Sequence, residues 1–417
     1  MLSGSWIECA LEKGGRSVRD RFQSWMLLFL MTGSVASVVG CNSDRNPVEP
    51  PPSPQLIASG KQIFRFDTFG DEKFWTDTLH MERVIQAAVD PTTALSVGLK
   101  VDMDTLPAAI VQAIQAGQVD LKSPATTVAL IKLGAVVGVR GTVVTVNGRD
   151  SLTRVGITCA LCHSTVDDAF APGIGHRLDG WPNRDLNPGA IIALSGALTP
   201  AQKAVYNSWG AGKYDPRYNF DGKNGPTVIP PAYGLAGLHS VTFTGDGTDL
   251  EYWNRYVAVT QMHGQGNFSE PRLGINVQQP APNLVEPKLP ALQAYQLSLN
   301  APAAPAGSFD ATAAARGQVV FAGPGKCAQC HVGQEFTDGN TRLHALSEIP
   351  TDPAYALRTA TRQWRTSPLK GVWQHPPYFH DGSAATLADV VERYNSKLAL
   401  NLTAQQKADL VEYLKSL

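Results

Sequence analysis

Two short motifs hold the residues of this chain that are best suited to chemistry. Each has the order Cys-x-x-Cys-His, at residues 159–163 and 327–331. Two thiols at this spacing lie on one turn of helix, and an imidazole follows them directly. The chain has six cysteines, and the two outside the motifs, Cys9 and Cys41, lie near the N-terminus. We therefore expect no disulfide framework in the folded body.

The order of these residues favours covalent haem attachment over other uses of paired cysteines. The thiols form thioethers with the haem, and the histidine that follows binds the iron. Zinc sites pair such motifs at spacings of roughly 15 to 20 residues, whereas these motifs lie far apart and each has its own histidine. A thioredoxin-like redox pair needs no such histidine. The sequence predicts two covalently bound haem c groups, with these attachment residues and proximal ligands: Cys159, Cys162, His163, Cys327, Cys330 and His331.

The ligand on the other side of each iron separates an electron carrier from an enzyme. A six-coordinate iron mainly transfers electrons, whereas an open site can meet an oxidant. None of the six methionines follows the second motif, so the second haem lacks the usual methionine nearby. Its iron either borrows a ligand from the other domain, uses a histidine or tyrosine, or is open, and the local candidates are His344, His375, His380, Tyr378 and Tyr394. The candidates for the first haem are His176, His239, Met262 and His263, and spacing alone does not choose among them.

The N-terminus has the order of an export signal. Basic residues between positions 13 and 21 precede an apolar run at 25–31, and small residues follow up to Gly40. The apolar run is too short to favour a membrane-spanning helix. We expect residues 1–40 to be a lipoprotein signal peptide, because Val-Val-Gly-Cys at 38–41 resembles a bacterial lipobox. The alternative is an ordinary cleavage site beside a chance cysteine.

Lipidation of Cys41 would anchor the protein in a membrane. Asn42, in place of an aspartate, favours the outer membrane by resemblance to enteric lipoproteins. We therefore expect a periplasmic protein with a lipid anchor. The net charge of −1 gives no support for nucleic-acid binding.

A chain of 417 residues is long for one hydrophobic core, and an internal repeat indicates two related halves. Residues 58–64 resemble residues 315–321, and each segment lies upstream of a Cys-x-x-Cys-His motif. Each half also ends on a similar helical segment, at 292–299 and 410–417. The fold class expected is mainly α, with two cytochrome c-like haem domains, long loops and little sheet. The predicted organisation is a Pro-rich linker at 41–56, a first haem domain at 57–300 and a C-terminal cytochrome c domain at 301–417.

The first half contains an insertion at residues 65–156. Helices are expected at about 107–116 and 126–133, with Pro107 in a first helical turn. Asn-Gly at 147–148, after the β-branched run 143–146, predicts a small β-hairpin. Residues 179–231 are rich in Gly, Pro, Asn and Asp, which favours long ordered loops.

Two C-terminal segments carry a resemblance to a known family. Residues 365–372 (Arg-Thr-Ser-Pro-Leu-Lys-Gly-Val) and 377–387 (Pro-Tyr-Phe-His-Asp-Gly-Ser-Ala-Ala-Thr-Leu) resemble the C-terminal haem domain of bacterial di-haem cytochrome c peroxidases. The superfamily includes the di-haem enzyme that matures the tryptophan-derived cofactor of methylamine dehydrogenase. The resemblance is good over the last hundred residues and loose over 159–299, and the insertion has no counterpart.

The resemblance implies roles for several residues. Tyr394 matches the position of the second iron's distal ligand, which is methionine in the peroxidases and tyrosine in the cofactor-maturing enzyme. His176, in a Gly-Ile-Gly-His segment, matches the distal histidine that leaves the first iron on activation. His263 falls at or near a glutamate that moves protons in the peroxidases, and an imidazole can act as acid and base. His380 matches a family motif residue near the second haem, which favours a structural role over that of a ligand.

Two further family features are less direct. A tryptophan between the haems has no counterpart at 244–247, and the residues that could replace it are Trp181, Trp253, Trp364 and Trp373. The family also holds a calcium ion between its domains, which would here involve Asn187 and the carbonyl oxygens of His375 and Pro377.

The function expected is therefore a peroxidase-like oxidoreductase. The second haem would take electrons from a small cytochrome or cupredoxin, and the first would reduce peroxide or a related small oxidant. The alternative is a plain electron-transfer cytochrome, which the missing glutamate favours. A third hypothesis, suggested by Tyr394, is an oxidase that acts on a protein or organic substrate.

Overall fold

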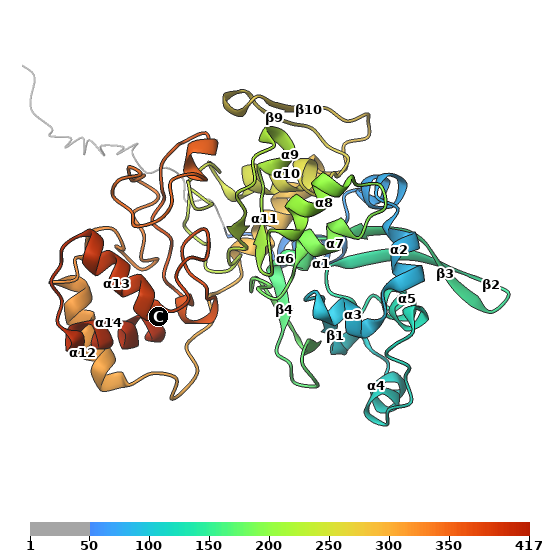
Figure 1. The fold of residues 1–417 in the computed structure, drawn as a ribbon, viewed down its shortest axis with the longest axis horizontal. Coiled ribbons are helices and arrows are strands. Elements are labelled where there is room, and N and C mark those ends of the chain that lie inside the picture. Colours follow the sequence, from blue (N-terminus) through green and yellow to red (C-terminus); the bar gives the residue numbers. More distant parts are fainter. Residues whose placement is uncertain (1–50) are drawn as a thin grey trace, which may run out of the picture. The chain divides into compact units, whose positions relative to one another are not determined.

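Helices and irregular segments make up most of the structure, a computed structural model that describes residues 51–417. The predictions for the signal peptide and for Cys41 lie outside these residues. The α-helices are α1 (Pro54–Phe66), α2 (Met81–Ala88), α3 (Pro91–Ser96), α4 (Ala108–Gln115), α5 (Pro124–Lys132), α6 (Ala160–His163), α7 (Pro188–Ala193), α8 (Pro200–Asn207), α9 (Tyr218–Asp221), α10 (Leu250–Thr260), α11 (Leu289–Leu297), α12 (Ala311–Ala322), α13 (Leu387–Lys397) and α14 (Ala404–Ser416) (Figure 1). Within the part described, no helix combines the length and apolar character needed to cross a bilayer.

Shorter helical turns connect these helices. One is a π-helix, η1 (Lys73–Thr78). The others are 3₁₀ turns: η2 (Met103–Thr105), η3 (Pro271–Leu273), η4 (Glu286–Lys288), η5 (Cys327–Gln329), η6 (Ala356–Arg358) and η7 (Val372–Gln374).

The strands form only two-stranded sheets among the described residues. The strands are β1 (Val101–Asp102), β2 (Val139–Val146), β3 (Arg149–Ile157), β4 (Ser164–Val166), β5 (Ile174–Gly175), β6 (Arg177–Asp179), β7 (Lys213–Tyr214), β8 (Thr227–Val228), β9 (Phe268–Glu270) and β10 (Ile275–Val277). The pair β1–β5 is parallel, and β2–β3, β4–β6, β7–β8 and β9–β10 are antiparallel. The expectation of a mainly α fold with little sheet is met.

The internal repeat is visible as two equivalent helix pairs. Helix α1 packs against α11, and α12 packs against α14. Ser53 caps α1 and Asp310 caps α12, each by accepting hydrogen bonds from the first turn. Phe64 meets Tyr295 in the first pair just as Phe321 meets Tyr413 in the second, with ring centroids 5.5 and 5.2 Å apart. The repeated motif therefore has a repeated packing arrangement.

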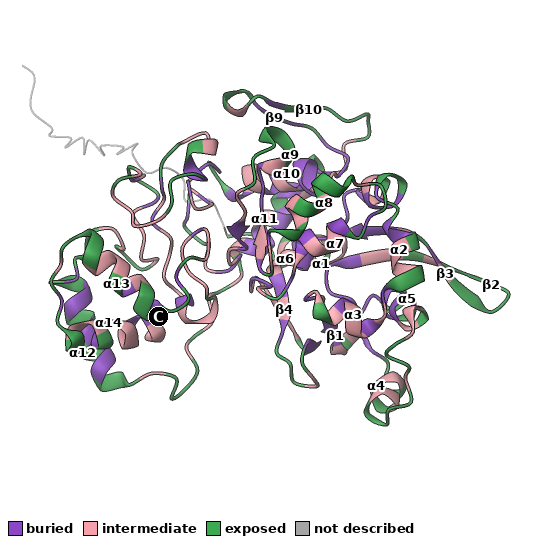
Figure 2. Ribbon diagram, viewed as in Figure 1, coloured by how far each residue is buried: buried purple, intermediate pink, exposed green. Residues whose placement is uncertain are grey.

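The insertion folds largely as its sequence predicts. Helices α4 and α5 fall at the expected places, although Pro107 is the N-cap of α4 and precedes its first turn. Strands β2 and β3 form the predicted hairpin, and Asn147 and Gly148 both have positive φ, as a two-residue turn requires. The tip of this hairpin is exposed (Figure 2).

Two sequence predictions about local structure need correction. Residues 179–231 are not only loops, because α7, α8 and α9 and the pair β7–β8 lie within them. Their many Pro and Asn residues act partly as helix starts: Pro188 opens α7 behind an Asn187 cap. The predicted linker is also too long, since Ser53 and Pro54 begin α1.

Residues Pro52–Leu417 form one compact unit, so the predicted boundary between residues 300 and 301 stays a prediction. For orientation we call 57–300 the first half and 301–417 the second half. The buried apolar residues form three main clusters, one dominated by the insertion, one around α1, α10 and α11, and one among α12, α13 and α14. The site described next lies where these clusters meet the motifs.

Candidate haem sites

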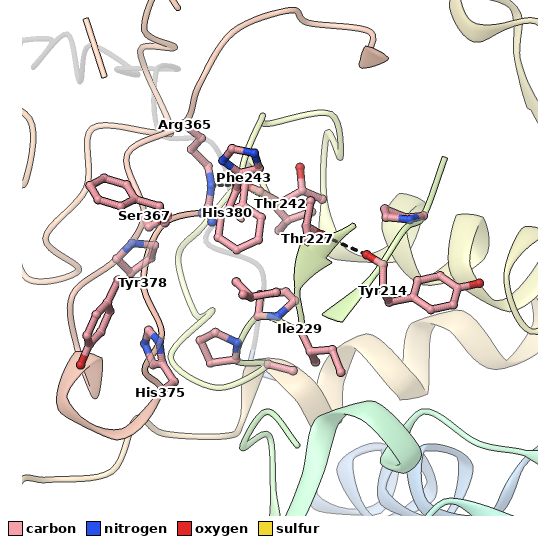
Figure 3. A pocket seen from close by; sticks show the side chains of 18 of the residues that line it. Tyr214, Thr227, Ile229, Thr242, Phe243, Arg365, Ser367, His375, Tyr378 and His380 are labelled. Atoms are coloured by element: carbon pink, nitrogen blue, oxygen red, sulfur yellow. Dashed lines mark hydrogen bonds between the residues drawn. The ribbon is translucent and has the colours of Figure 1, made fainter. Parts of the chain in front are cut away.

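One cavity of about 740 Å³ contains both Cys-x-x-Cys-His motifs in its lining. Its wall is mostly apolar and combines residues of both halves. Figure 3 shows part of this wall, with His375 and Tyr378 close together at one side and Tyr214 at the other. A volume of this size falls in the range of cofactor pockets.

Each motif forms a single helical turn. In the first, the backbone N–H of His163 donates to the carbonyl of Cys159 at 3.2 Å, and in the second, His331 donates to Cys327 at 2.9 Å. The local structure thus brings both cysteines and the histidine of each motif to one turn, as the sequence predicts. Strand β3 leads directly into the first motif, and α12 leads into the second.

In each of the two motif histidines, Nδ1 makes a hydrogen bond and Nε2 makes none among the described residues. Nδ1 of His163 lies 3.1 Å from the carbonyl oxygen of Pro230, and Nδ1 of His331 lies 2.9 Å from that of Phe336. A carbonyl oxygen only accepts, so Nδ1 carries the hydrogen in both rings. Burial lowers the pKa of His163 to about 4 and also lowers that of His331. Both imidazoles are therefore neutral, with the Nε2 lone pair available to a metal.

The four thiols of the motifs are not disulfide-bonded. Burial raises the pKa of both Cys159 and Cys162 to about 12. In the absence of a bound metal, both groups are therefore protonated thiols at neutral pH.

The charges in the wall also fit a group that carries carboxylates, as haem does. Five cationic side chains line the cavity against a single carboxylate, that of Glu348. Arg342 pairs with Glu348 at 2.6 Å. Arg184 has Nε and Nη1 buried without a hydrogen-bond partner among the described residues. Arg365, which is half-buried, donates through its side chain only to the carbonyl oxygens of Thr242 and Ser240 among the described residues. Cationic groups removed from water in this way call for an anionic partner.

Two of the candidates for the distal side of the first haem lie in the cavity wall. Met262 is buried there, and His263 follows it with a left-handed φ of 64°. The His263 ring stacks on Phe74, and burial lowers its pKa to about 4. His263 is therefore neutral at pH 7, and the same burial makes its imidazole a weaker base than a free histidine.

His176 does not line the cavity, and its role as distal ligand of the first iron stays a prediction. Its side chain is 51% exposed, and Nδ1 lies 2.8 Å from a carboxylate oxygen of Asp104. It sits between β5 and β6, and β5 pairs with β1 of the insertion. The insertion supplies Asp104, so this contact could not be inferred from a family without the insertion. His239 also lies outside the cavity lining.

On the second motif's side, Tyr394 projects from α13 into the cavity lining, and burial raises the pKa of its hydroxyl. No hydrogen bond engages that hydroxyl among the described residues. His344 is different, because its Nε2 lies 2.9 Å from the Thr366 hydroxyl and 3.1 Å from Asp338, and its Nδ1 lies 3.1 Å from Glu348. Both of its nitrogens are thus engaged, so Tyr394 is better placed than His344 to meet a metal.

The other candidates near the second motif are also in the wall. His380 contacts the Thr351 hydroxyl at 3.0 Å through Nδ1 and packs on Trp364, with ring centroids 4.6 Å apart. Burial lowers the pKa of His375 to about 3. His375 and Tyr378 line the same cavity.

The tryptophans divide into two groups. Trp253 and Trp364 line the cavity, whereas Trp181 and Trp373 pack on each other outside its lining, with centroids 6.0 Å apart. The Asn187 side chain accepts the Ala190 N–H at 3.0 Å as the cap of α7. A calcium ion at Asn187 would have to share that oxygen with the helix cap.

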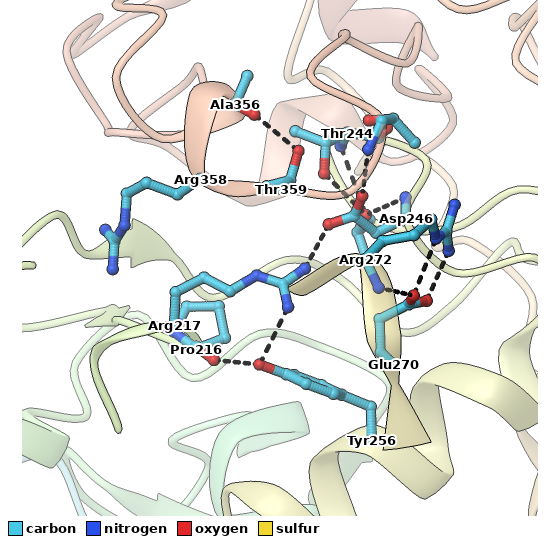
Figure 4. A network of polar contacts seen from close by, with 12 residues as sticks. Pro216, Arg217, Thr244, Asp246, Tyr256, Glu270, Arg272, Ala356, Arg358 and Thr359 are labelled. Atoms are coloured by element: carbon cyan, nitrogen blue, oxygen red, sulfur yellow. Dashed lines mark hydrogen bonds and ion pairs between the residues drawn. The ribbon is translucent and has the colours of Figure 1, made fainter. Parts of the chain in front are cut away.

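Sequence reasoning missed a buried ion network that joins the two halves (Figure 4). Arg217 pairs with Asp246, which accepts the Thr361 N–H at 3.1 Å. Arg358 of the second half binds Asp215 and Asp221 of the first, at 3.0 and 2.7 Å. Sequence reasoning also missed Phe74, Trp75 and Arg184, which line the cavity. None of these residues belongs to a motif whose spacing in the sequence would have indicated a site.

Comparison with known proteins identifies the C-terminal segment. The family model described as Cytochrome c matches residues 314–417, which supports haem c as a cofactor. No curated protein matches the chain.

Three solved structures are similar to parts of the chain. Hydrazine synthase of Kuenenia stuttgartiensis is 21% identical over 46% of this chain and 73% of that one, with a TM-score of 0.31. A MauG-like protein associated with microbial copper homeostasis is 20% identical over 47% and 74%, with a TM-score of 0.33. A variant of a di-haem peroxidase from Burkholderia thailandensis is 16% identical over 79% and 88%, with a TM-score of 0.32.

The matched segment contains the second motif, α13 with Tyr394, and both segments that resemble the di-haem peroxidases. Residues 314–417 are therefore similar to the cytochrome c family over about the last quarter of the chain.

Proposed function

We propose that this protein is a di-haem c-type oxidoreductase of the peroxidase kind. It takes electrons at the second motif and reduces peroxide or a related small oxidant beside the first. The observation that carries this proposal is the single cavity that both motifs share with His263 and Tyr394. An electron carrier does not need an acid–base group next to a haem, whereas reduction of peroxide consumes protons as well as electrons.

The residues of the chain would divide the work. Haem, when bound, supplies the redox centre and the iron that meets the oxidant. His163 and His331 would hold the two irons through Nε2, each fixed by its Nδ1 contact. Tyr394 would be a further ligand of the iron held by His331. His263 would take a proton from the oxidant at a ring nitrogen and return it to the departing oxygen. The apolar wall limits access of water.

Two haems per chain is the first requirement of the proposal. The mass of the purified protein should exceed that of the mature chain by two haem groups. Replacement of Cys327 and Cys330 by alanine should remove one haem and leave the first. A wild-type protein with a single haem would contradict the assignment.

Peroxide reactivity is the second requirement. The reduced protein, mixed with hydrogen peroxide in a stopped-flow instrument, should reoxidise much faster than a free haem peptide. His263→Gln should slow this reaction by about 10²- to 10⁴-fold, the usual contribution of a general acid–base group. His80→Gln is the matched control, since His80 is exposed and absent from the cavity wall. Reoxidation no faster than that of the haem peptide would overturn the proposal.

A second candidate is a plain electron-transfer cytochrome. It is favoured by Met262 and His263, either of which could supply a sixth ligand from the cavity wall. It predicts two six-coordinate low-spin haems in every redox state. A high-spin signal in optical or electron paramagnetic resonance (EPR) spectra, or tight cyanide binding, would count against it and in favour of the peroxidase.

Location and partners complete the proposal. We propose a periplasmic protein anchored by lipid at Cys41, on the outer membrane, that receives electrons from a small cytochrome or cupredoxin. Cys41→Ser should release the protein from membranes and abolish labelling by radioactive palmitate. A calcium ion at Asn187 and the carbonyl oxygens of His375 and Pro377 would appear in metal analysis of the purified protein and be lost with a chelator.

A further inference from the structure

Phe74 and His263 form the closest aromatic contact of the described residues. Their ring centroids are 3.7 Å apart and their planes differ by 22°. The His263 ring makes no hydrogen bond among these residues, unlike the rings of His163 and His331. A ring without a hydrogen bond is oriented only by packing and by its backbone. The stacking partner is therefore the main control on the direction of the His263 nitrogens.

Phe74 lies in the insertion, on the π-helix η1. Helices of this type are rare and frequent at functional sites. Phe74, Trp75 and Leu79, from η1 and its C-cap, all line the cavity that contains the motifs. The indole Nε1 of Trp75 is buried without a hydrogen-bond partner among the described residues. The insertion thus presents an aromatic surface to the first haem site.

Strand β3 holds η1 in place on one side. The Thr76 hydroxyl donates to the carbonyl of Val155 at 3.1 Å and accepts the Val155 N–H at 2.9 Å. The Asp71 carboxyl accepts the Ile157 N–H at 3.2 Å. Since β3 runs directly into the first motif, the same strand positions the motif and the π-helix.

The segment that carries His263 is tied to the insertion on the other side. Gln265 donates its backbone N–H to the Phe69 carbonyl at 2.7 Å, and its side chain accepts from Nζ of Lys73 at 2.8 Å. A Cβ on Gly264 would lie 2.8 Å from Cβ of Phe69, so the two backbones are in close contact. Both backbones that meet in the Phe74–His263 stack are therefore fixed.

We propose that the π-helix of the insertion forms one wall of the reactive site, and that Phe74 is the residue that positions the His263 imidazole. The proposal deepens the function proposed above and rests on it for the role of His263. It also assigns a purpose to the insertion, which has no counterpart in the family that the motifs resemble. Phe74 does not itself touch the oxidant, and it acts through His263.

A positioning role requires an aromatic ring, whereas simple filling of the core requires only apolar volume. Phe74→Leu keeps an apolar side chain but loses the ring that stacks on His263. Phe74→Tyr keeps the stacked ring and most of its apolar surface. Phe66→Leu is the matched control, because Phe66 is a half-buried ring of the same insertion that faces Arg140 and Arg177 outside the cavity lining. Each variant is examined as the purified protein with both haems attached.

The first measurement is peroxide-driven reoxidation. Phe74→Leu should be about 10- to 100-fold slower than wild type, the usual effect of a misplaced catalytic group, and Phe74→Tyr and Phe66→Leu should match wild type. The second is the ferric EPR spectrum and cyanide affinity of the first haem, which should change in Phe74→Leu only. A Phe74→Leu protein with wild-type rate and spectrum overturns the proposal.

Two further results keep the test decisive. If Phe74→Leu does not fold, Lys73→Met removes the tie to Gln265 without emptying the core. It should change the first haem's EPR spectrum, and an unchanged spectrum overturns the proposal. If wild type does not react with peroxide, the proposed function fails, and the positioning role is then decided by the EPR spectrum and cyanide affinity of Phe74→Leu alone.

Discussion

A Cβ atom placed on Gly317 would lie 2.0 Å from the carbonyl oxygen of Asp409. The equivalent contact in the first half joins Gly60 to the carbonyl oxygen of Ala291, where a Cβ would lie 1.9 Å away. In both cases the next residue that the added Cβ would meet is a tyrosine one helical turn further along, Tyr413 or Tyr295. Each half thus crosses its first and last helices at a glycine, which lets the two backbones touch.

The crossing predicts that Gly317→Ala is strongly destabilising. The added methyl group meets backbone that cannot move aside, so the helices must separate, and overpacking of this kind costs about 1–3 kcal/mol or more. Guanidinium denaturation, followed by circular dichroism, measures the loss. Gly196→Ala is the control, because nothing lies within 4 Å of its position. Equal stability of the two variants would contradict the crossing.

These crossings explain why the repeat could be predicted from sequence. The segments 58–64 and 315–321 share a glycine and an aromatic residue because each must pack on a closing helix. The hairpin was also predictable, since Asn147 and Gly148 meet a local requirement for positive φ. Sequence patterns of this kind indicate contacts between residues that are close in the chain, or contacts that occur once in each half.

The wall of the site could not be predicted in the same way. His176 and His263 both follow the first motif, and only His263 lies in the cavity wall. The insertion contacts both residues, since its Asp104 lies against His176 and its Phe74 packs on His263. Both contacts join residues far apart in the chain. Arg184 and Arg217 were missed for the same reason, because a buried cation has no sequence pattern until its surroundings are known.

The buried pair Arg217–Asp246 predicts a large effect of removing one partner. The two side chains are only 4% and 3% exposed. Asp246→Ala would leave the guanidinium buried without its partner and free the Thr361 N–H, which comes from the second half. Loss of one member of a buried pair costs about 3–5 kcal/mol. Denaturant titration should show this loss for Asp246→Ala, whereas Asp77→Ala, in the exposed pair with Arg154, should cost less than about 1 kcal/mol.

Substitution of Arg184 should change the midpoint potential of one haem. Burial lowers its pKa to about 10, so the guanidinium remains charged at neutral pH. A haem carboxylate beside it would be compensated by this charge. Arg184→Gln should therefore lower the midpoint potential of one haem, because uncompensated negative charge stabilises ferric iron, and Arg184→Lys should retain most of the wild-type value. Spectroelectrochemical titration measures both, with Arg83→Gln as the control because the Arg83 side chain is 75% exposed. Unchanged potentials in Arg184→Gln would rule out such a contact.

Asp71, next to the π-helix that carries Phe74, predicts a pH dependence of stability. The residue is wholly buried, and burial raises its pKa from 3.8 to about 9 against the opposing effect of the Ile157 N–H, with smaller increases from Glu72 and Asp67. The folded protein keeps this carboxyl protonated over a range in which the unfolded chain releases the proton. The unfolded state therefore binds fewer protons, and its stabilisation grows as the pH rises.

The free energy of unfolding should accordingly lose up to about 1.4 kcal/mol per pH unit from this group between about pH 4 and 9. Asp71→Asn cannot ionise and keeps an oxygen that can accept the Ile157 N–H. It should match wild type at pH 4, be more stable at pH 8, and show a flatter profile between them. Asp77→Asn, in an exposed ion pair, should keep the wild-type slope. An Asp71→Asn profile parallel to that of wild type would mean that Asp71 is ionised in the folded protein.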